Sequence, residues 1–383
     1  MMKFSFDNAT EIHFGQGQIA QIAEAIPPGA KVLLTYGGGS IKQNGVYDQV
    51  VAALSQHQWG EFSGIEANPQ YDTLMAAVAM IRQEGYDYLL AVGGGSVVDG
   101  TKFLSVAAPF QGEDPWAILA EGISSQGALP LGCVLTLPAT GSESNIAAVV
   151  SRGGSKLFFY DRRVRPKFAV LDPSVTLSLS PRQVANGVVD AYVHVMEQYL
   201  TYPVHAKVQD RFAEGLLLTL MEEGPKALEQ PDDLTVRSNL MWAATMALNG
   251  LIGAGVPQDW TTHMIGHELT ALYGVDHARS LSIMLPAVMW ERREAKRAKL
   301  LQYARRVHGI TDGAEDARVQ GAIEATVAFF RHMGVPTSLS EAEIGPEAVE
   351  QVLANLKAHG REAMGEHGDI GLQQCRAILE SAL

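Results

Sequence analysis

The stretch Tyr88-Leu-Leu-Ala-Val-Gly-Gly-Gly-Ser-Val-Val-Asp99 decides the fold class of this chain. It starts as an apolar run typical of a buried strand, passes through three glycines and continues into residues that suit the start of a helix. Such a junction presents backbone N–H groups to a phosphate, and glycine lets the backbone approach because it has no Cβ. The stretch indicates a nucleotide-binding loop, although a tight strand-to-helix turn without a ligand explains one such loop equally well.

A second copy of the pattern precedes it. The run Lys31–Tyr36 leads into Gly37-Gly38-Gly39-Ser40, and two copies favour nucleotide binding more than one. Neither copy is GxGxxG or the P-loop motif. No acidic residue follows until Asp48, whereas an NAD-preferring site commonly places a carboxylate at the ribose. The loop therefore favours NADP(H). Lys42 either supplies a positive charge to the 2′-phosphate of this cofactor or is a solvated helix lysine.

The chain changes character near residue 178. Before it, strands alternate with helices, which predicts a parallel sheet with helices on both faces. The elements expected there are strands at Lys31–Tyr36, Tyr88–Val92, Gly132–Leu137 and Phe168–Leu171 and a helix at Tyr71–Glu84.

After that point helical periodicity dominates, and Pro181 stands where a helix would start. Helices are expected at Gln183–Leu200, Ala206–Glu222, Val236–Gly250, Asp259–Leu272, Glu291–Val307, Asp316–Met333 and Pro346–His359, with Gly224-Pro225 and Pro231-Asp232 as breaks. The prediction is an α/β dinucleotide-binding domain over residues 1–178 and an all-helical metal-binding domain over residues 179–383, with the site in the cleft between them.

Four residues of the second half suit a metal. Asp190 and His194 are spaced i, i+4, so a helix would place them on one face. His263 and His277 complete a set of one carboxylate and three imidazoles, which suits Fe²⁺ or Zn²⁺. A histidine on an apolar helix face is more often a core residue, and His263-x3-His267 lacks the glutamate of the metalloprotease motif.

The order of motifs resembles the iron-containing (group III) alcohol dehydrogenase family, closest to its branch of NADPH-dependent aldehyde reductases and butanol dehydrogenases. The motifs span the chain: Phe14-Gly-Gln-Gly17, Gly93-Gly-Gly-Ser-Val-Val-Asp99 with Lys102, Thr136-Leu-Pro-Ala-Thr140-Gly-Ser-Glu143, Leu171-Asp-Pro173, Asp190-x3-His194 with Glu197, and His263-x3-His267-x9-His277. Two positions depart from the family: Gly39 replaces a frequent acidic residue, and Ala278 replaces a frequent glycine.

The resemblance implies a dehydroquinate synthase-like architecture, with a Rossmann-like α/β domain and an all-α domain. It implies Asp190, His194, His263 and His277 as metal ligands, with the cofactor pyrophosphate on Gly94, Gly95 and Ser96. Further implied cofactor contacts are Gly37, Gly38, Gly39, Ser40, Asp99, Thr136, Thr140, Asn145, Lys156 and Leu179. On their own, Asp99 would be a helix first-turn acid, the two threonines turn hydroxyls, Lys156 a surface lysine and Leu179 a core leucine.

The implied reaction is NADPH-dependent reduction of an aldehyde to a primary alcohol, with the metal polarising the substrate oxygen. Asp99 is expected near the nicotinamide, as a candidate catalytic residue. His267 is the candidate proton relay; a fifth ligand and a structural neighbour are its alternatives. Iron and zinc both fit, and intrinsic affinity favours zinc.

Bulk properties agree with a soluble enzyme that acts on a small molecule. The net charge of −13 disfavours nucleic acid and anionic membranes as partners. Two cysteines form no disulfide framework, and no apolar leader or spanning run occurs, so the cytoplasm is expected. A homodimer is expected from the resemblance.

Three other functions compete with this one. A glycerol-dehydrogenase-like or dehydroquinate-synthase-like enzyme would share the two domains, but the spacing of the metal residues fits the alcohol dehydrogenases better. A metal-dependent hydrolase would not need the paired glycine loops. A non-catalytic scaffold would not need a carboxylate buried among imidazoles.

Overall fold

The computed structural model describes all 383 residues of the chain. They form two compact units, which are described separately: residues 7–179, and residues 180–383 together with residues 1–6. The first six residues thus belong with the helical unit, although the sequence analysis places them in the α/β domain. Their attachment includes a hydrogen bond from the Met2 backbone N–H to the Gly255 carbonyl oxygen.

The α/β unit is built on a six-stranded sheet in the order β1-β8-β5-β4-β2-β3, and all of its strand pairs are parallel. The predicted parallel sheet is confirmed. Its strands are β1 (Glu11–Phe14), β2 (Lys31–Tyr36), β3 (Gln58–Phe62), β4 (Tyr88–Gly94), β5 (Leu131–Leu137) and β8 (Phe168–Leu171).

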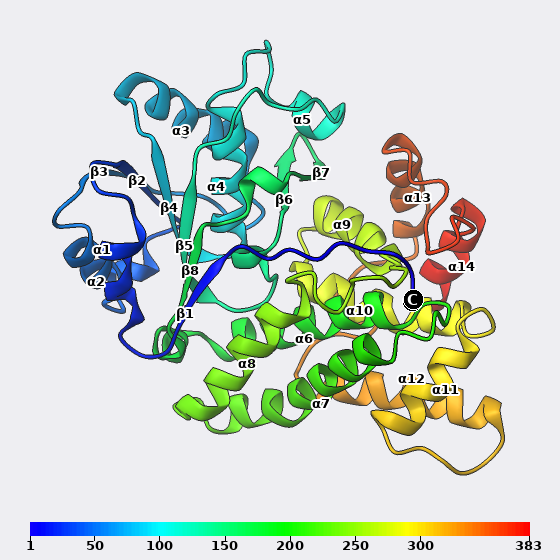
Figure 1. Cartoon of the computed structure of the whole chain (residues 1–383). Coiled ribbons are helices and arrows are strands. Elements are labelled where there is room, and N and C mark those ends of the chain that lie inside the picture. Colours follow the sequence, from blue (N-terminus) through cyan, green and yellow to red (C-terminus); the bar gives the residue numbers. More distant parts are fainter. The chain divides into compact units, whose positions relative to one another are not determined.

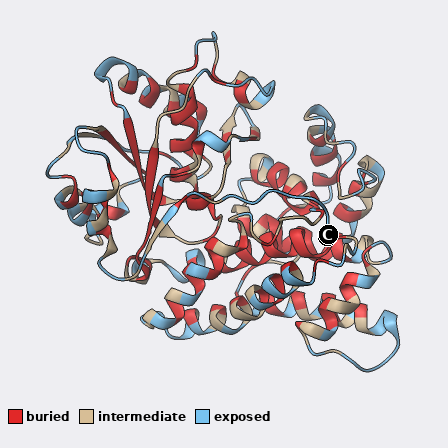
Figure 2. Cartoon of the chain, viewed as in Figure 1, coloured by how far each residue is buried: buried red, intermediate tan, exposed pale blue.

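Both faces of this sheet are covered, because successive strand residues point to opposite sides. Leu33 of β2 lies in one apolar core with α3 (Tyr71–Glu84) and α4 (Gly95–Ala107). Its neighbours Val32 and Leu34 lie in a second core with α1 (Ile22–Ala25) and α2 (Val46–Ala53). The inner strands β2, β4, β5 and β8 are accordingly buried along most of their length, whereas the edge strands β1 and β3 are not (Figure 2).

An antiparallel hairpin was missed by the sequence analysis. It pairs β6 (Ala147–Arg152) with β7 (Ser155–Tyr160), and a short helix α5 (Ala117–Ala120) packs on β7. Gly153 and Gly154 form its two-residue turn with φ values of 56° and 81°, the positive φ that such a turn requires. The Gly-Gly pair was therefore a legible signal for the hairpin.

The second unit is helical, as predicted (Figure 1). Its helices are α6 (Pro181–Tyr199), α7 (Lys207–Glu229), α8 (Leu234–Ala247), α9 (Thr261–Tyr273), α10 (His277–Glu291), α11 (Arg297–Arg306), α12 (Glu315–His332), α13 (Ala348–Ala358) and α14 (Leu372–Ser381). None of the helices combines the length and the apolar character that a membrane span requires.

Two helix boundaries predicted from proline and periodicity are wrong. The Gly224-Pro225 pair does not end a helix, because α7 continues through it to Glu229. A helix does not run from residue 291 to 307: α10 ends at Glu291, a turn follows, and α11 begins at Arg297. The helix α10 itself was missed, and it contains Pro286 in its interior.

Helix α6 lies at the centre of the helical unit. It contacts α7, α8 and α10, and its residues from Val188 to Tyr199 are all buried (Figures 1 and 2). The helices α9, α10, α13 and α14 share a separate apolar core that includes Ile265, Ile283 and Val352. Side chains on the inner faces of α6, α9 and α10 are thus removed from water by packing.

Candidate functional site

The register of α6 is fixed where the helix begins. Pro181 is its first residue, and Ser180 and Gln183 form a reciprocal capping box. Two turns further on, Asp190 and His194 lie on one face, with Asp190 Oδ1 3.8 Å from His194 Nδ1. Both side chains are about 4–5% exposed, so the predicted carboxylate–imidazole pair is a buried one.

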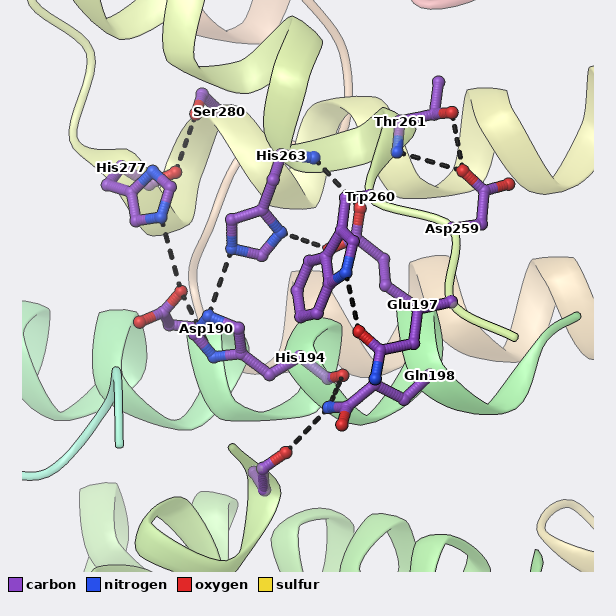
Figure 3. A network of polar contacts seen from close by, with 12 residues as sticks. Asp190, His194, Glu197, Gln198, Asp259, Trp260, Thr261, His263, His277 and Ser280 are labelled. Atoms are coloured by element: carbon purple, nitrogen blue, oxygen red, sulfur yellow. Dashed lines mark hydrogen bonds and ion pairs between the residues drawn. The ribbon is translucent and has the colours of Figure 1, made fainter. Parts of the chain in front are cut away.

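The other two predicted ligands come from α9 and α10. His263 Nε2 lies 3.1 Å from His194 Nε2, and His277 Nε2 lies 3.7 Å from Asp190 Oδ1. One donor atom from each of Asp190, His263 and His277 falls within a span of 4.8 Å. The structure therefore brings together all four residues, with His194 next to the converging three (Figure 3).

This donor set fits a divalent first-row ion. Nitrogen donors about 2.0–2.1 Å from a tetrahedral ion lie about 3.3 Å from one another, close to the 3.1 Å between His194 Nε2 and His263 Nε2. A carboxylate supplies the negative charge that a cation needs in a buried place. The chemistry of the four groups and their spacing agree with a single metal ion.

Glu197 orients one of these imidazoles. Its carboxylate contacts His263 Nδ1, and its Oε1 accepts a hydrogen bond of 3.0 Å from the His263 backbone N–H. This contact directs His263 Nε2 to the cluster, as carboxylates behind metal-binding histidines commonly do. Burial raises the pKa of the Glu197 carboxyl, and the backbone hydrogen bond opposes that rise.

Trp260 closes the same side of the cluster. Its ring centroid lies 5.3 Å from that of His263 and 6.2 Å from that of His194, with edge-to-face geometry in both cases. Neither this contact nor the role of Glu197 behind His263 is predicted from the sequence. Both depend on residues from two elements meeting in space.

His267 lies one helical turn beyond His263 on α9. Its ring centroid is 6.0 Å from that of His263 and 5.2 Å from that of His277, and it is 7% exposed. It is close to the cluster but is not one of the three residues whose donors converge. Its role as a proton relay stays a prediction.

A second missed feature holds the start of α10, where His277 lies. Asp276 Oδ2 accepts hydrogen bonds of 2.8 Å from both Arg182 Nε and Asn186 Nδ2 of α6. Arg182, Asn186, Asp190 and His194 recur every four residues, so one face of α6 contributes both two predicted ligands and this anchor. That periodicity was visible in the sequence.

The first glycine loop follows the end of β2 and leads into a short 3₁₀ turn, Ser40–Lys42. Gly39 has φ +92°, a conformation that favours glycine, and an added Cβ at Gly38 or Gly39 would meet no atom within 4 Å. The backbone here faces open space. The arrangement suits the approach of a ligand to the loop.

The second loop is closely packed on its other side. An added Cβ at Gly95 would lie 2.5 Å from Thr140 Oγ1, and one at Gly94 would lie 3.2 Å from Leu137 Cβ. Gly95 is the first residue of α4, whose N-terminal N–H groups can bind an anion. Ser96 Oγ accepts a hydrogen bond of 3.2 Å from the Asn68 N–H.

Asp99 is tied into the fold by both oxygens. Oδ1 accepts from Ser142 Oγ at 2.5 Å, and Oδ2 accepts from the Val149 N–H at 3.0 Å. Burial raises the pKa of Asp99, against the field of the nearby Lys102 and Lys156. A place near the nicotinamide and a catalytic role for Asp99 remain predictions.

The remaining predicted cofactor residues lie around the same hairpin or close to it along the chain. Asn145 Oδ1 accepts from Lys102 Nζ at 2.8 Å, and burial lowers the pKa of Lys102 to about 8. Lys156 is only 8% exposed, so it is not a solvated surface lysine. Thr136 lies on β5, Thr140 Oγ1 accepts from the Ser142 N–H, and Leu179 ends the 3₁₀ helix Pro173–Ser178.

The chain is similar to known proteins along its whole length. The family model for iron-containing alcohol dehydrogenase matches residues 9–173, and that for the C-terminal domain of the Fe-containing alcohol dehydrogenase family matches residues 184–383. The chain is 57% identical over 386 residues to the NADPH-dependent aldehyde reductase YqhD of Escherichia coli (strain K12), covering 100% of both chains.

Two solved structures extend this likeness to three dimensions. The crystal structure of E. coli K-12 YqhD has a TM-score of 0.99 and 56% identity, covering 100% of this chain and 99% of that one. NADH-dependent butanol dehydrogenase A from Thermotoga maritima has a TM-score of 0.96 and 34% identity, with coverage of 100% and 99%. From the family models, the identity and the converging ligand set together, the chain belongs to the iron-containing alcohol dehydrogenase family.

Proposed function

We propose that this chain is an NADPH-dependent aldehyde reductase that interconverts aldehydes and primary alcohols. The observation that carries the proposal is the convergence of Asp190, His263 and His277, with His194 beside them, in a chain that also presents two glycine loops. The 57% identity to an NADPH-dependent aldehyde reductase over the full length supports the same activity.

Asp190, His194, His263 and His277 would hold one divalent ion, iron or zinc. When bound, the ion would polarise the carbonyl oxygen of the aldehyde, and NADPH would supply the hydride. The protein itself orients the ligands and excludes water. Glu197 would keep His263 Nε2 turned to such an ion, and the packing around α6 keeps bulk water away.

The proton that completes the alcohol has a candidate donor in His267. Its imidazole lies beside those of His263 and His277 without belonging to the converging donor set. A histidine can hold and pass on a proton near neutral pH. We assign to His267 the delivery of this proton to the substrate oxygen.

The nucleotide would lie along the two glycine loops. The N–H groups of Gly94, Gly95 and Ser96 at the start of α4 suit the pyrophosphate, and the open backbone of Gly37–Ser40 suits the adenosine end. Thr136, Thr140, Asn145, Lys156, Leu179 and Asp99 would complete the contacts. The absence of a carboxylate at Gly39 is the reason for preferring NADPH.

We further propose a cytoplasmic homodimer. The dimer follows from the family resemblance, and the cytoplasm agrees with two free, buried cysteines, Cys133 and Cys375. Sedimentation analysis of the purified protein tests the dimer. A monomer at all concentrations would contradict it.

The function is tested by oxidation of NADPH over a panel of aldehydes, with the metal content measured on protein purified without chelator. We expect turnover of several aldehydes and about one ion per chain. Oxidation of glycerol and related polyols in preference to simple alcohols would favour a polyol dehydrogenase. Ester or amide hydrolysis without any nucleotide would favour a metal-dependent hydrolase.

A further inference from the structure

A charged cluster lies beside the first glycine loop. The parallel strands β2 and β3 end at the same edge of the sheet, with Leu34 in register with Glu61. Glu61 Oε2 accepts hydrogen bonds from the hydroxyls of Tyr36 at 3.2 Å and Tyr47 at 2.7 Å. The carboxylate is thus fixed at the edge from which Gly37–Ser40 departs.

Lys42 is held against this carboxylate. Its backbone N–H donates to the Gly39 carbonyl at 3.0 Å, so Lys42 lies one 3₁₀ turn beyond the left-handed glycine. Its Nζ lies 3.4 Å from Glu61 Oε1, 5.1 Å from the Tyr36 ring centroid and 4.5 Å from the Tyr47 ring centroid. Two aromatic faces and one carboxylate therefore position the ammonium group.

Both charges are present at neutral pH. The Tyr36 hydroxyl, as the leading cause, raises the pKa of Lys42, which keeps its ammonium form. Burial acts to raise the pKa of Glu61, but hydrogen bonds from Tyr47 and Tyr36 prevail and lower it. The side chains are 44% and 38% exposed, so a ligand can reach them.

An ion pair exposed to this extent contributes little to stability. If a phosphate binds to the adjacent loop, the Lys42–Glu61 pair can instead act in binding that phosphate. The 2′-phosphate is the only chemical difference between NADPH and NADH, and Lys42 is the one lysine or arginine between β2 and β3. An anion near Lys42 would gain from its charge and lose from that of Glu61.

We propose that Lys42 receives the 2′-phosphate of NADPH, and that Glu61 determines how strongly it does so. The inference rests on the proposed function, because it needs a nucleotide on the first loop. Lys42 is a binding residue in this assignment, and Glu61 acts through it. The relatives with NADPH and NADH in their names show that this preference varies among similar proteins.

The test measures the dissociation constants of NADPH and NADH by nucleotide fluorescence, without substrate. Loss of one charge-assisted contact in Lys42→Met should weaken NADPH about tenfold and change NADH less than about twofold. Glu61→Gln should tighten NADPH about threefold, because Lys42 loses its competing anion. Lys42→Arg keeps the charge and should keep the preference.

Two further measurements separate this role from a structural one. The double variant Lys42→Met/Glu61→Gln should gain less NADPH affinity over Lys42→Met than Glu61→Gln gains over the wild type, since only the direct repulsion between Glu61 and the phosphate is then relieved. The dependence of NADPH affinity on salt should weaken in Lys42→Met. Lys167→Met removes one exposed charge beside the amino end of β8, at the opposite edge of the sheet, and should leave both nucleotides unchanged.

The outcomes are distinguishable. A wild-type protein that binds NADH more tightly than NADPH would overturn the cofactor assignment, and the inference with it. A wild type that prefers NADPH, combined with equal losses for both nucleotides in Lys42→Met, would overturn the inference alone. Unchanged NADPH binding in a folded Lys42→Met protein would do the same.

Discussion

Asn186 donates its side-chain amide to Asp276, the residue directly before His277, over 2.8 Å. This bond joins helix α6, which carries the proposed ligands Asp190 and His194, to the start of α10. His277 is the most exposed of the four proposed ligands, with 23% of its side chain accessible, so we expect it to depend most on such an anchor. The Asn186 amide therefore helps to fix the position of His277, although its hydrogen bond goes to Asp276 and not to the proposed metal.

The first prediction concerns that anchor. Asn186→Ala should speed release of bound Zn²⁺ to a chelator by about tenfold, as loss of outer contacts to metal ligands commonly does. The measurement is the rate of colour formation with a zinc indicator. Gln320→Ala removes an exposed helical amide on α12 and should have no effect. Equal release rates in Asn186→Ala and the wild type would contradict the anchoring role.

The second prediction concerns the ligands as a set. Asp190→Ala or His263→Ala should lose most of the metal and all measurable turnover, because each leaves the site with too few donors. NADPH should still bind, since the glycine loops belong to residues 7–179 and the ligands to the helical unit. Metal analysis and nucleotide titration on the same sample check this. A metal-free Asp190→Ala protein with full activity would rule out the assigned site.

The third prediction assigns His267. His267→Ala should retain metal but lose rate, with an altered pH dependence of kcat, because a proton donor is removed and no ligand is lost. The effect is expected to be about 10²-fold or more in kcat. Metal content serves as the control measurement. Loss of metal equal to that in His263→Ala would make His267 a ligand instead.

The fourth prediction uses the open backbone at Gly39. Gly39→Asp places a carboxylate where a 2′-phosphate would lie and should reduce the preference for NADPH by about 1–3 kcal/mol in kcat/KM. Gly39→Asn is the matched control, because it bears the same strain at φ +92° without the charge. If the two variants behave alike, backbone strain rather than charge accounts for the change.

The fifth prediction concerns stability and pH. Burial lowers the pKa of His308 from 6.5 to about 4, and its ring packs edge-on against Tyr303 at 4.7 Å. Between these values the unfolded chain binds the proton more readily, so stability falls as the pH drops from 6.5 towards 4. With partial exposure taken into account, the loss is about 1–2 kcal/mol.

Urea unfolding at a series of pH values measures this loss. His308→Gln should show a shallower fall across the window, because it has no proton to bind. Above neutral pH, the free energy of unfolding should depend on pH in the same way in the wild type and in His308→Gln. Identical slopes in the acidic window would show that other groups account for the acid sensitivity.

Much of the fold could be predicted from local sequence patterns. The strands Lys31–Tyr36 and Phe168–Leu171 and the helix Tyr71–Glu84 have the predicted bounds, because buried apolar runs and helical periodicity are properties of short segments. Pro225 shows where prediction from local sequence fails, because helix α7 continues through it. An added Cβ at Gly224 would lie 2.8 Å from Val188 of α6, so close packing between helices holds α7 together across a residue that locally disfavours it.

The site divides in the same way. The pairing of Asp190 with His194 follows from a spacing of four residues on one helix. The contacts of Glu197 with His263, Asn186 with Asp276 and Lys42 with Glu61 each join two elements. No spacing along the chain encodes such pairings, because they arise from tertiary packing.

The recurrence of Arg182, Asn186, Asp190 and His194 along α6 has a consequence for how the chain can vary. A residue inserted within this helix between positions 182 and 194 would rotate everything beyond it by about 100° and turn part of the face away from the metal. Insertions in the turns between α8 and α9, or between α11 and α12, leave this spacing intact. We expect insertions and deletions among related sequences to occur in those turns, and the length of α6 between positions 182 and 194 to stay constant.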